Sequence, residues 1–370
     1  MVIAAPQVLT VDGLVPASVV VEDGRVVSVG AERADLVLPD GILAPGLIDL
    51  QVNGFFGVDF AESDDWGDAV RRLPETGVTS FLPTFVTATI EALVDGLRRA
   101  AVPLDGARVL GVHVEGPFLA EARRGAHDAS LFRDPTPERV DALLEPGTMA
   151  LLTLAPERAG ALEAIERLAD AGVLVSCGHT DATADVVSAA AGAGARMITH
   201  LFNAQRGIHH REPGVAGWGL ADPRLSCGLI LDGHHVADAV ARIALAAAPG
   251  RICLVTDSIA AAGMPAGMYE LGGAPVIVRD GQPPRRADGT LAGANLRLDD
   301  AVGRAVALGL SPAAAIEAAT RVPADLLGRA DLGRIEPGAV ADLVWLGPDF
   351  RTRAAWIGGE LVHGAPEVVA

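Results

Sequence analysis

The chain has 370 residues, a formal net charge of −18 and 50% apolar residues. At about 150 residues per domain, this length fits two or three domains, or one large barrel with an attachment. The acidic balance argues against nucleic-acid binding as the main function, because Lys and Arg contacts dominate affinity for phosphate backbones, whereas one local Arg could still bind a small anion.

No run approaches the ~20 apolar residues of a membrane-spanning helix. The first residues lack the basic and apolar regions of a secretory signal, so a cytoplasmic protein without membrane partners is expected. All 29 basic residues are arginine, which excludes Schiff-base lysines, the P-loop lysine and a carbamylated lysine bridging two metals. Cys177, Cys227 and Cys253 show no CxxC spacing, which predicts buried thiols in a reducing compartment.

Both ends of the chain are predicted to be rich in β-strands. Short alternating runs are separated by Asp-Gly turns at the start and by Gly-rich breaks at the end. The expected strands are Gln7–Val11, Ala17–Glu22, Arg25–Val29, Leu36–Leu38, Ala339–Leu346, Ala354–Ile357 and Glu360–Val362. The simplest arrangement joins both ends into one small β-sandwich domain, 1–43 plus 336–370, which flanks a central domain, 44–335.

The central segment alternates apolar strands with Ala- and Leu-rich helical patterns, which is typical of a parallel α/β sheet. The expected helices are Glu91–Ala100, Ala159–Ala171, Ala182–Ala191, Val236–Ala247, Leu298–Leu308 and Pro312–Ala319. Ser311 before Pro312 predicts an N-cap followed by proline in the first turn.

Eight strands can be assigned in this segment. They are Leu47–Gln51, Thr79–Pro83, Arg108–Glu115, Met149–Leu154, Val173–Cys177, Met197–His200, Ser226–Asp232 and Ile252–Asp257. Eight strand–helix repeats predict a (β/α)8 barrel of the TIM type; a doubly wound sheet is the alternative. After the eighth strand, Leu271–Gly289 is expected to insert over the barrel mouth, with a hairpin formed by Ala274–Val278 and Asp280-Gly281.

Polar residues interrupt the apolar strands where these strands end, which is where barrels carry their catalytic groups. Five of the nine histidines lie at or near such ends: His113, His179, His200, His234 and His235. Glu115, His179, His200 and Asp257 come from four different strands. All four side chains are therefore expected to meet at one mouth.

Glu115, His179 and His200 form a His2Glu set, which leaves one coordination position open as in catalytic zinc sites. The sequence therefore predicts one divalent metal ion per subunit, zinc before iron or another divalent ion. Water at the open position would have its pKa lowered toward ~7. Asp257 is the natural general base and acid, taking the proton from this water and returning it to a leaving amine.

Two further polar positions bear on the metal count. His113 alternates with Glu115 along its strand, and is expected either beside the site or in the barrel interior. Gln51 and Asn53 occupy first-strand positions at which many metal hydrolases of this architecture carry His-x-His. Amides are weak zinc ligands and no lysine can bridge, so a binuclear site is not expected.

Ordered motifs along nearly the whole chain resemble the N-acetylglucosamine-6-phosphate deacetylases of the amidohydrolase superfamily. The most specific are His113-Val114-Glu115-Gly116-Pro117, Thr199-His200-Leu201-Phe202-Asn203-Ala204 and Arg211-Glu212-Pro213-Gly214. Further matches are Pro45–Asp49, Gly125–His127, Gly178–Thr180, Asp232–Val236, Leu254–Asp257 and Leu291–Gly293. The segment Gly333–Val344 resembles amidohydrolases in general.

The resemblance implies hydrolysis of N-acetyl-D-glucosamine 6-phosphate to D-glucosamine 6-phosphate and acetate. It assigns the metal to Glu115, His179 and His200 and the acid/base role to Asp257, in agreement with the argument from the strand ends. It adds His127 as a catalytic residue that helps the metal polarise the acetyl carbonyl.

The resemblance also implies a phosphate site formed by Arg211 and the backbone N–H groups of Asn203 and Ala204, since a guanidinium binds phosphate through paired hydrogen bonds. In this family the loop carrying Arg211 reaches across a dimer, which implies a homodimer. The other implied substrate contacts are Ala126, His127, Asp232, His235, Leu291, Ala292 and Gly293.

Two departures from the family pattern could shift the substrate range: Ala294 stands where Ser is common and Gln205 where Met is usual. One alternative is another mononuclear amidohydrolase, acting on a related N-acyl sugar phosphate, a cyclic amide or an amino group. The other is a non-catalytic sugar-phosphate sensor. The retained set of Glu115, His179, His200 and Asp257 argues against the sensor.

Overall fold

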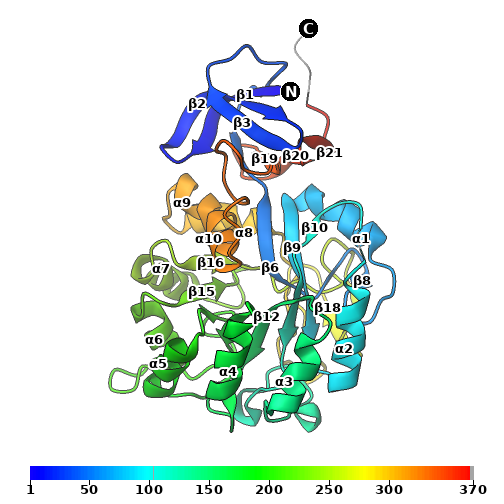
Figure 1. Ribbon diagram of the computed structural model, residues 1–370, viewed down its shortest axis with the longest axis vertical. Helices are drawn as coiled ribbons and strands as arrows, with labels where there is room; N and C mark the ends of the chain where they lie inside the picture. The colour runs from blue at the N-terminus through cyan, green and yellow to red at the C-terminus, as the bar shows by residue number, and fades with distance from the viewer. Residues whose placement is uncertain (103, 367–370) are drawn as a thin grey trace.

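Fully buried apolar runs in the centre of the chain form a parallel barrel, in a computed structural model that describes residues 1–102 and 104–366 (Figure 1). Its strands are β6 (Leu47–Val52), β9 (Val78–Val86), β11 (Val112–Glu115), β12 (Met149–Leu154), β13 (Leu174–Cys177), β14 (Met197–Ile198), β15 (Ser226–Leu229) and β16 (Ile252–Leu254). They pair in this order, and a short strand, β10 (Arg108–Val109), also pairs with β9. The ring closes where the Asp257 N–H donates to the Gln51 carbonyl at 2.9 Å. The expected eight-stranded barrel is confirmed.

The expected strand Arg108–Glu115 is divided into β10 and β11, and three other barrel strands end earlier than the sequence suggested. β14, β15 and β16 end at Ile198, Leu229 and Leu254, so the polar residues that follow them lie outside the hydrogen-bonded pairing of the strands. These residues turn toward the barrel mouth, and the expectation that the strands continue to His200, Asp232 and Asp257 was wrong for that reason.

Helices surround the barrel. Those expected from the sequence are α2 (Ile90–Arg99), α4 (Ala161–Asp170), α5 (Ala184–Ala193), α7 (Asp238–Ala247), α8 (Leu298–Ala307) and α9 (Pro312–Glu317). Ser311 Oγ accepts from the Ala314 N–H at 3.2 Å, which confirms the expected N-cap. Helices that the pattern missed are α1 (Gly67–Arg72), α3 (Pro137–Leu144), α6 (Gly214–Ala221) and α10 (Arg321–Leu326). α6 was missed because its glycines and continuous apolar run give no helical periodicity.

Both ends of the chain build one separate sheet beside the barrel (Figure 1). Its strands are β1 (Val2–Thr10), β2 (Gly13–Glu22), β3 (Arg25–Gly30), β4 (Leu36–Val37), β5 (Ile42–Pro45), β19 (Leu343–Leu346), β20 (Thr352–Ile357) and β21 (Glu360–His363). β5 pairs with β19, which joins the N-terminal part to the C-terminal part. The eight strands form one hydrogen-bonded sheet around a core of its own, which includes Ile3, Leu43 and Trp356. The exact domain boundaries stay a prediction.

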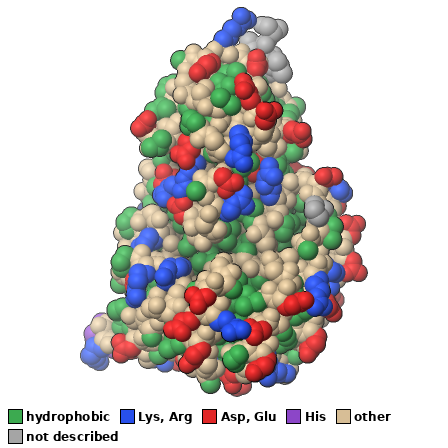
Figure 2. Space-filling view, viewed as in Figure 1, with side chains coloured by type: hydrophobic (Ala, Val, Ile, Leu, Met, Phe, Trp, Pro, Cys, Tyr) green, Lys and Arg blue, Asp and Glu red, His purple; other side chains and the backbone are tan. Residues whose placement is uncertain are grey.

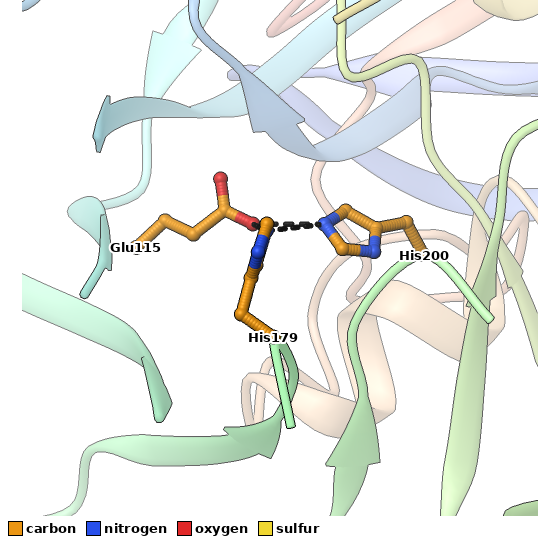
Figure 3. A group of neighbouring side chains, drawn as sticks. All are labelled: Glu115, His179 and His200. Atoms are coloured by element: carbon orange, nitrogen blue, oxygen red, sulfur yellow. Dashed lines mark hydrogen bonds and ion pairs between the residues drawn. The ribbon is translucent and has the colours of Figure 1, made fainter. Parts of the chain in front are cut away.

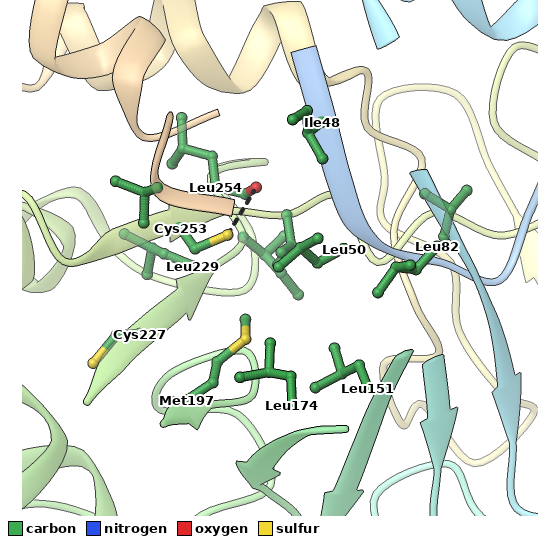
Figure 4. Close-up of a cluster of buried hydrophobic side chains, with 14 of the residues drawn as sticks. Ile48, Leu50, Leu82, Leu151, Leu174, Met197, Cys227, Leu229, Cys253 and Leu254 are labelled. Atoms are coloured by element: carbon green, nitrogen blue, oxygen red, sulfur yellow. Dashed lines mark hydrogen bonds between the residues drawn. The ribbon is translucent and has the colours of Figure 1, made fainter. Parts of the chain in front are cut away.

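Apolar side chains from successive strands fill the barrel below its mouth (Figure 4). Ile48, Leu151 and Leu254 are each at most 1% exposed, as tight packing of a barrel interior requires. The three cysteines are buried and free, as expected. Burial raises the pKa of the Cys177 and Cys227 thiols to about 12, so both remain unionised.

A hairpin leans over the barrel mouth after the eighth strand. It consists of β17 (Gly267–Leu271) and β18 (Ala274–Val278), joined at Gly272-Gly273. The turn expected at Asp280-Gly281 does bring Ile277 opposite Arg285, but only as a single bridge. The main partner of β18 therefore precedes it in the chain. Within the described residues, no helix combines the length and apolar character needed to span a bilayer.

Candidate active site

Three buried side chains converge at the carboxyl ends of β11, β13 and β14 (Figure 3). Glu115 is the last residue of β11, and His179 and His200 each lie two residues beyond their strands. Glu115 Oε1 lies 3.2 Å from His179 Nε2 and 2.9 Å from His200 Nε2. The two Nε2 atoms are 3.2 Å apart. The sequence had predicted this grouping from the strand ends alone.

The orientation of His179 fits a metal ligand. Its Nδ1 lies 2.9 Å from the carbonyl oxygen of Arg123. A carbonyl only accepts, so Nδ1 carries the ring proton and Nε2 presents its lone pair to Glu115 and His200. A lone pair packed against a carboxylate and a second imidazole is unfavourable unless a shared proton or a cation lies between them. The donor set of two nitrogens and one oxygen therefore fits a divalent metal with an open position.

The backbone at these positions explains why the strands stop early. His179, His200 and Asp257 have φ values of 47°, 27° and 52°. This left-handed region is costly for residues with a Cβ atom, and such strain is concentrated at functional sites. The turned backbone directs all three side chains into one cavity.

Asp257 is held by two amides at the end of the first strand, Gln51 within β6 and Asn53 directly after it. Its Oδ1 accepts from Asn53 Nδ2 at 2.7 Å and from Gln51 Nε2 at 3.2 Å. Burial and the nearby charge of Glu115 raise the pKa of Asp257 to about 6. A carboxyl group with such a pKa can both accept and return a proton near neutral pH. The sequence indicated these amides only as weak metal ligands, so their contact with Asp257 was not predicted.

His127 comes from the loop after β11 and faces the ligand set. Its Nδ1 accepts from the backbone N–H of Thr87 at 3.4 Å and lies 2.9 Å from Thr87 Oγ1. The ring proton is therefore on Nε2, which lies 3.9 Å from Glu115 Oε2. Burial and the neighbouring His179 lower the pKa of His127 to about 3, so its imidazole is neutral.

A cavity of about 380 Å³ opens over these groups. Besides the residues above, its lining includes six that the resemblance had suggested as substrate contacts: Ala126, Asn203, Ala204, His235, Leu291 and Gly293. The lining residues that were not anticipated are Val86, Gly125, Ile230, Leu271, Arg285, Gly289 and Thr290. Three of them lie in the expected insertion Leu271–Gly289 and Gly125 lies in the Gly125–His127 match, but neither signal identifies single lining residues.

Three suggested contacts lie outside this lining. Asp232 Oδ1 accepts from the N–H groups of His234 and His235, and its Oδ2 lies 2.7 Å from His235 Nδ1, so Asp232 orients His235. Ala292 is buried beside the cavity. Arg211 is exposed and contacts His210 Nε2 at 3.0 Å. It belongs to a projecting loop, where Figure 2 shows histidine and basic side chains together.

His113 lies in the barrel interior, one of its two expected positions. Its Nε2 is 2.8 Å from Thr153 Oγ1 and its Nδ1 is 3.3 Å from Thr84 Oγ1. Complete burial lowers its pKa to about 4. His113 is thus a neutral, hydrogen-bonded core residue below the metal ligands.

The barrel and its His2Glu set define the class of protein: a hydrolase fold whose barrel mouth carries a cluster that fits a divalent metal. The model of the Amidohydrolase family matches residues 42–362, and the chain belongs to this family. An N-acetylgalactosamine-6-phosphate deacetylase from Escherichia coli O157:H7 is 41% identical over 332 residues, covering 86% of this chain and 87% of the relative. An N-acetylglucosamine-6-phosphate deacetylase from Vibrio furnissii is 37% identical and covers 91% and 87% of the two chains.

The fold has a close structural counterpart. A mutant N-acetyl-D-glucosamine-6-phosphate deacetylase from Mycobacterium smegmatis, solved in complex with N-acetyl-D-glucosamine-6-phosphate, aligns with a TM-score of 0.92 at 38% identity. The alignment covers 98% of this chain and 99% of that chain. The chain is thus similar to sugar-phosphate deacetylases over both its barrel and its small sheet.

Proposed function

We propose that the protein hydrolyses N-acetyl-D-glucosamine 6-phosphate to D-glucosamine 6-phosphate and acetate. One observation carries this proposal: Asp257 and the Glu115, His179 and His200 set face one cavity. The family relatives with this activity in their names support the choice of substrate.

Glu115, His179 and His200 would hold one divalent ion, and zinc suits their nitrogen and oxygen atoms best. When bound, the ion supplies Lewis acidity at the scissile carbonyl and lowers the pKa of water. Gln51 and Asn53 each donate a hydrogen bond from the amide nitrogen to Asp257. This role accounts for both amides without a second metal ion, which supports a single metal.

The chain's own residues would carry the proton transfers. Asp257 accepts the proton of the attacking water and then delivers it to the leaving amine nitrogen. Its pKa of about 6 suits both steps. His127 donates from Nε2 to the carbonyl oxygen, and the neutral state of its ring supports this role.

The phosphate would lie against the N–H groups of Asn203 and Ala204 and against His235, on the opposite side of the cavity from His127. Arg211 is outside the cavity of its own chain, so it would serve the site of a second copy in a homodimer. Ala126, Leu291 and Gly293 would form the wall around the sugar. Ala292 would support this wall from behind, and Asp232 would act through His235.

A cytoplasmic location is part of this proposal. Three free, buried thiols are the pattern expected in a reducing compartment. A phosphorylated amino sugar is also a substrate of intracellular metabolism.

A second candidate substrate is N-acetyl-D-galactosamine 6-phosphate, which the 41% identical relative favours. Acetate release by the purified protein from each epimer, with and without chelator, tests both. We expect chelator-sensitive release, faster from the glucosamine epimer, and loss of release in Asp257→Asn. Faster release from the galactosamine epimer would make N-acetyl-D-galactosamine 6-phosphate the preferred substrate instead. Binding of either sugar phosphate without any release, even after zinc is added, would instead support the sensor.

A further inference from the structure

A second cavity, of about 600 Å³, adjoins the active-site cavity beneath the β17–β18 hairpin. The two cavities share lining residues, among them Val86, Ala126, His127 and Leu271. Hydrolysis of an acetyl group needs no space of this size on the far side of His127. The second cavity therefore requires an explanation that the proposed function does not give.

The barrel order determines which end of a substrate faces this cavity. Asn203 and His235 follow β14 and β15, whereas Val86 ends β9 and His127 follows β11. These two pairs of strands lie on opposite sides of the ring, and β13, which His179 follows, lies between them. In a 2-acylamino hexose 6-phosphate, the phosphate and the acyl group extend from opposite ends of the sugar ring. A phosphate beside Asn203 thus directs the acyl group toward the second cavity.

The lining of the second cavity changes from apolar to polar with distance from the metal ligands. Val86, Ala126 and Leu271 form the shared apolar part. Beyond it the lining includes two cations, Arg124 and Arg286, and two anions, Asp128 and Asp288. Arg286 Nη2 donates to the carbonyl oxygens of Ala126 and Leu271, each at 3.1 Å, and so lies directly behind the apolar part. The balanced charges favour a neutral polar group over an anion.

We propose that the second cavity is an acyl subsite. It would allow this site to hydrolyse amino-sugar 6-phosphates whose N-acyl chain is longer than acetyl and ends in a neutral polar group such as a hydroxyl. This inference rests on the proposed function. The bond chemistry is unchanged: water adds its oxygen to the acyl carbon, the C–N bond breaks with its electron pair on nitrogen, and a proton passes to the amine. The products are the amino-sugar phosphate and a hydroxy acid.

The test compares the N-acetyl, N-butanoyl and N-(4-hydroxybutanoyl) derivatives of glucosamine 6-phosphate. We expect kcat/KM for the hydroxybutanoyl derivative to lie within about tenfold of that for the N-acetyl derivative and above that for the butanoyl derivative. If the pocket were closed behind the acetyl group, kcat/KM would fall by about 10- to 200-fold for each methylene that does not fit. Ala274→Phe would fill the second cavity from a position that does not line the first. It should lower hydroxybutanoyl turnover about tenfold or more, by the same steric argument, and spare N-acetyl turnover.

Met268→Phe is the matched control, because Met268 lies on the same hairpin, is 74% exposed and lines neither cavity. Ala287→Phe, on the exposed rim of the second cavity, replaces Ala274→Phe if that variant fails to fold. N-acetyl turnover without hydroxybutanoyl turnover would overturn the acyl subsite and leave the proposed function intact. An equal loss of both activities in the cavity-filling variants would also overturn it. Failure of all three substrates in the wild type would refute the proposed function itself.

Discussion

Asn53 Nδ2 donates to Asp257 Oδ1 at 2.7 Å, and this bond joins the segments that follow the first and the eighth barrel strands. Gln51 donates to the same oxygen, at 3.2 Å. Two donors on Oδ1 leave Oδ2 free to exchange a proton with a substrate in the cavity. The same bonds favour the ionised carboxylate and oppose the effect of burial on its pKa.

Asn53→Leu removes the shorter of these two bonds. The pKa of Asp257 should then rise above its value of about 6. A general base must be ionised in the free enzyme, so the acid limb of the kcat/KM profile should move to higher pH. The energy of a hydrogen bond to a charged group corresponds to a shift of about one to two pH units. The measurement is the pH dependence of kcat/KM for acetate release.

Gln7→Leu is the control for this change, since Gln7 is an exposed amide on β1 of the small sheet. Its profile should match that of the wild type. An unchanged acid limb in Asn53→Leu, with metal content and folding intact, would show that Asn53 does not control the ionisation of Asp257.

The grouping of the candidate metal ligands could be predicted from the sequence because strand ends in a parallel barrel converge whatever the loops do. Glu115, His179 and His200 each lie at or just beyond the end of an apolar strand, so their grouping needed no knowledge of side-chain geometry. The role of Asn53 could not be predicted in the same way. It depends on the closure of the ring between β6 and β16, which brings together residues that are far apart in the sequence. Arg285 was missed because the path of the β17–β18 insertion depends on its tertiary contacts.

Removal of the metal should abolish activity and also destabilise the fold. Chelation leaves the Glu115, His179 and His200 donor atoms facing one another, at separations of 3.2 Å or less. Zinc at 100 times its Kd stabilises the bound form by about 2.7 kcal/mol. Scanning calorimetry should therefore show a lower Tm after chelation, and both Tm and acetate release should return when zinc is added.

His179→Ala should bind less metal than one ion per chain in elemental analysis and should show no rise in Tm with zinc. His363→Ala, on the small sheet, should keep both properties of the wild type. A full complement of metal in His179→Ala would mean that the ion binds elsewhere.

Asp181 links two loops of the active site. One oxygen accepts from Arg123 Nε at 2.8 Å and the other from Arg206 Nη2 at 2.6 Å. The carbonyl of Arg123 in turn accepts from His179 Nδ1. Asp181→Ala should loosen the segment that orients His179, so metal affinity should fall about 10- to 100-fold, as is typical when the support of a ligand is lost. Competition with a zinc chelator measures this change.

Asp331→Ala is the matched control, because Asp331 forms a comparable 2.8 Å pair with Arg329, which lies near the small sheet. Its zinc affinity should equal that of the wild type. Equal affinities in all three proteins would show that the Asp181 pairs are only surface contacts, which commonly contribute about 1 kcal/mol or less to stability.

Asp49 gives the barrel a pH-dependent stability. It lies on β6, is 1% exposed, and accepts from the N–H groups of Gln51 and Thr256 and from Thr256 Oγ1. Burial, with a smaller effect from the charge of Asp257, raises its pKa to about 7. The unfolded value is about 3.9, so the native state binds more protons between these limits and stability falls as pH rises through them, by an amount on the order of 4 kcal/mol.

Asn can replace Asp49 without loss of hydrogen bonds, since its Oδ1 can accept both N–H groups while its Nδ2 donates to Thr256 Oγ1. Asp49→Asn should therefore exceed the wild-type Tm by a margin that grows from pH 5 to pH 8, because the wild type loses stability as the pH rises toward the pKa of its core carboxyl group. Asp12→Asn, in an exposed turn, should follow the wild-type curve throughout. Calorimetric Tm values from pH 5 to 8 decide the question: parallel curves for Asp49→Asn and the wild type would mean that Asp49 is already ionised at the lower pH.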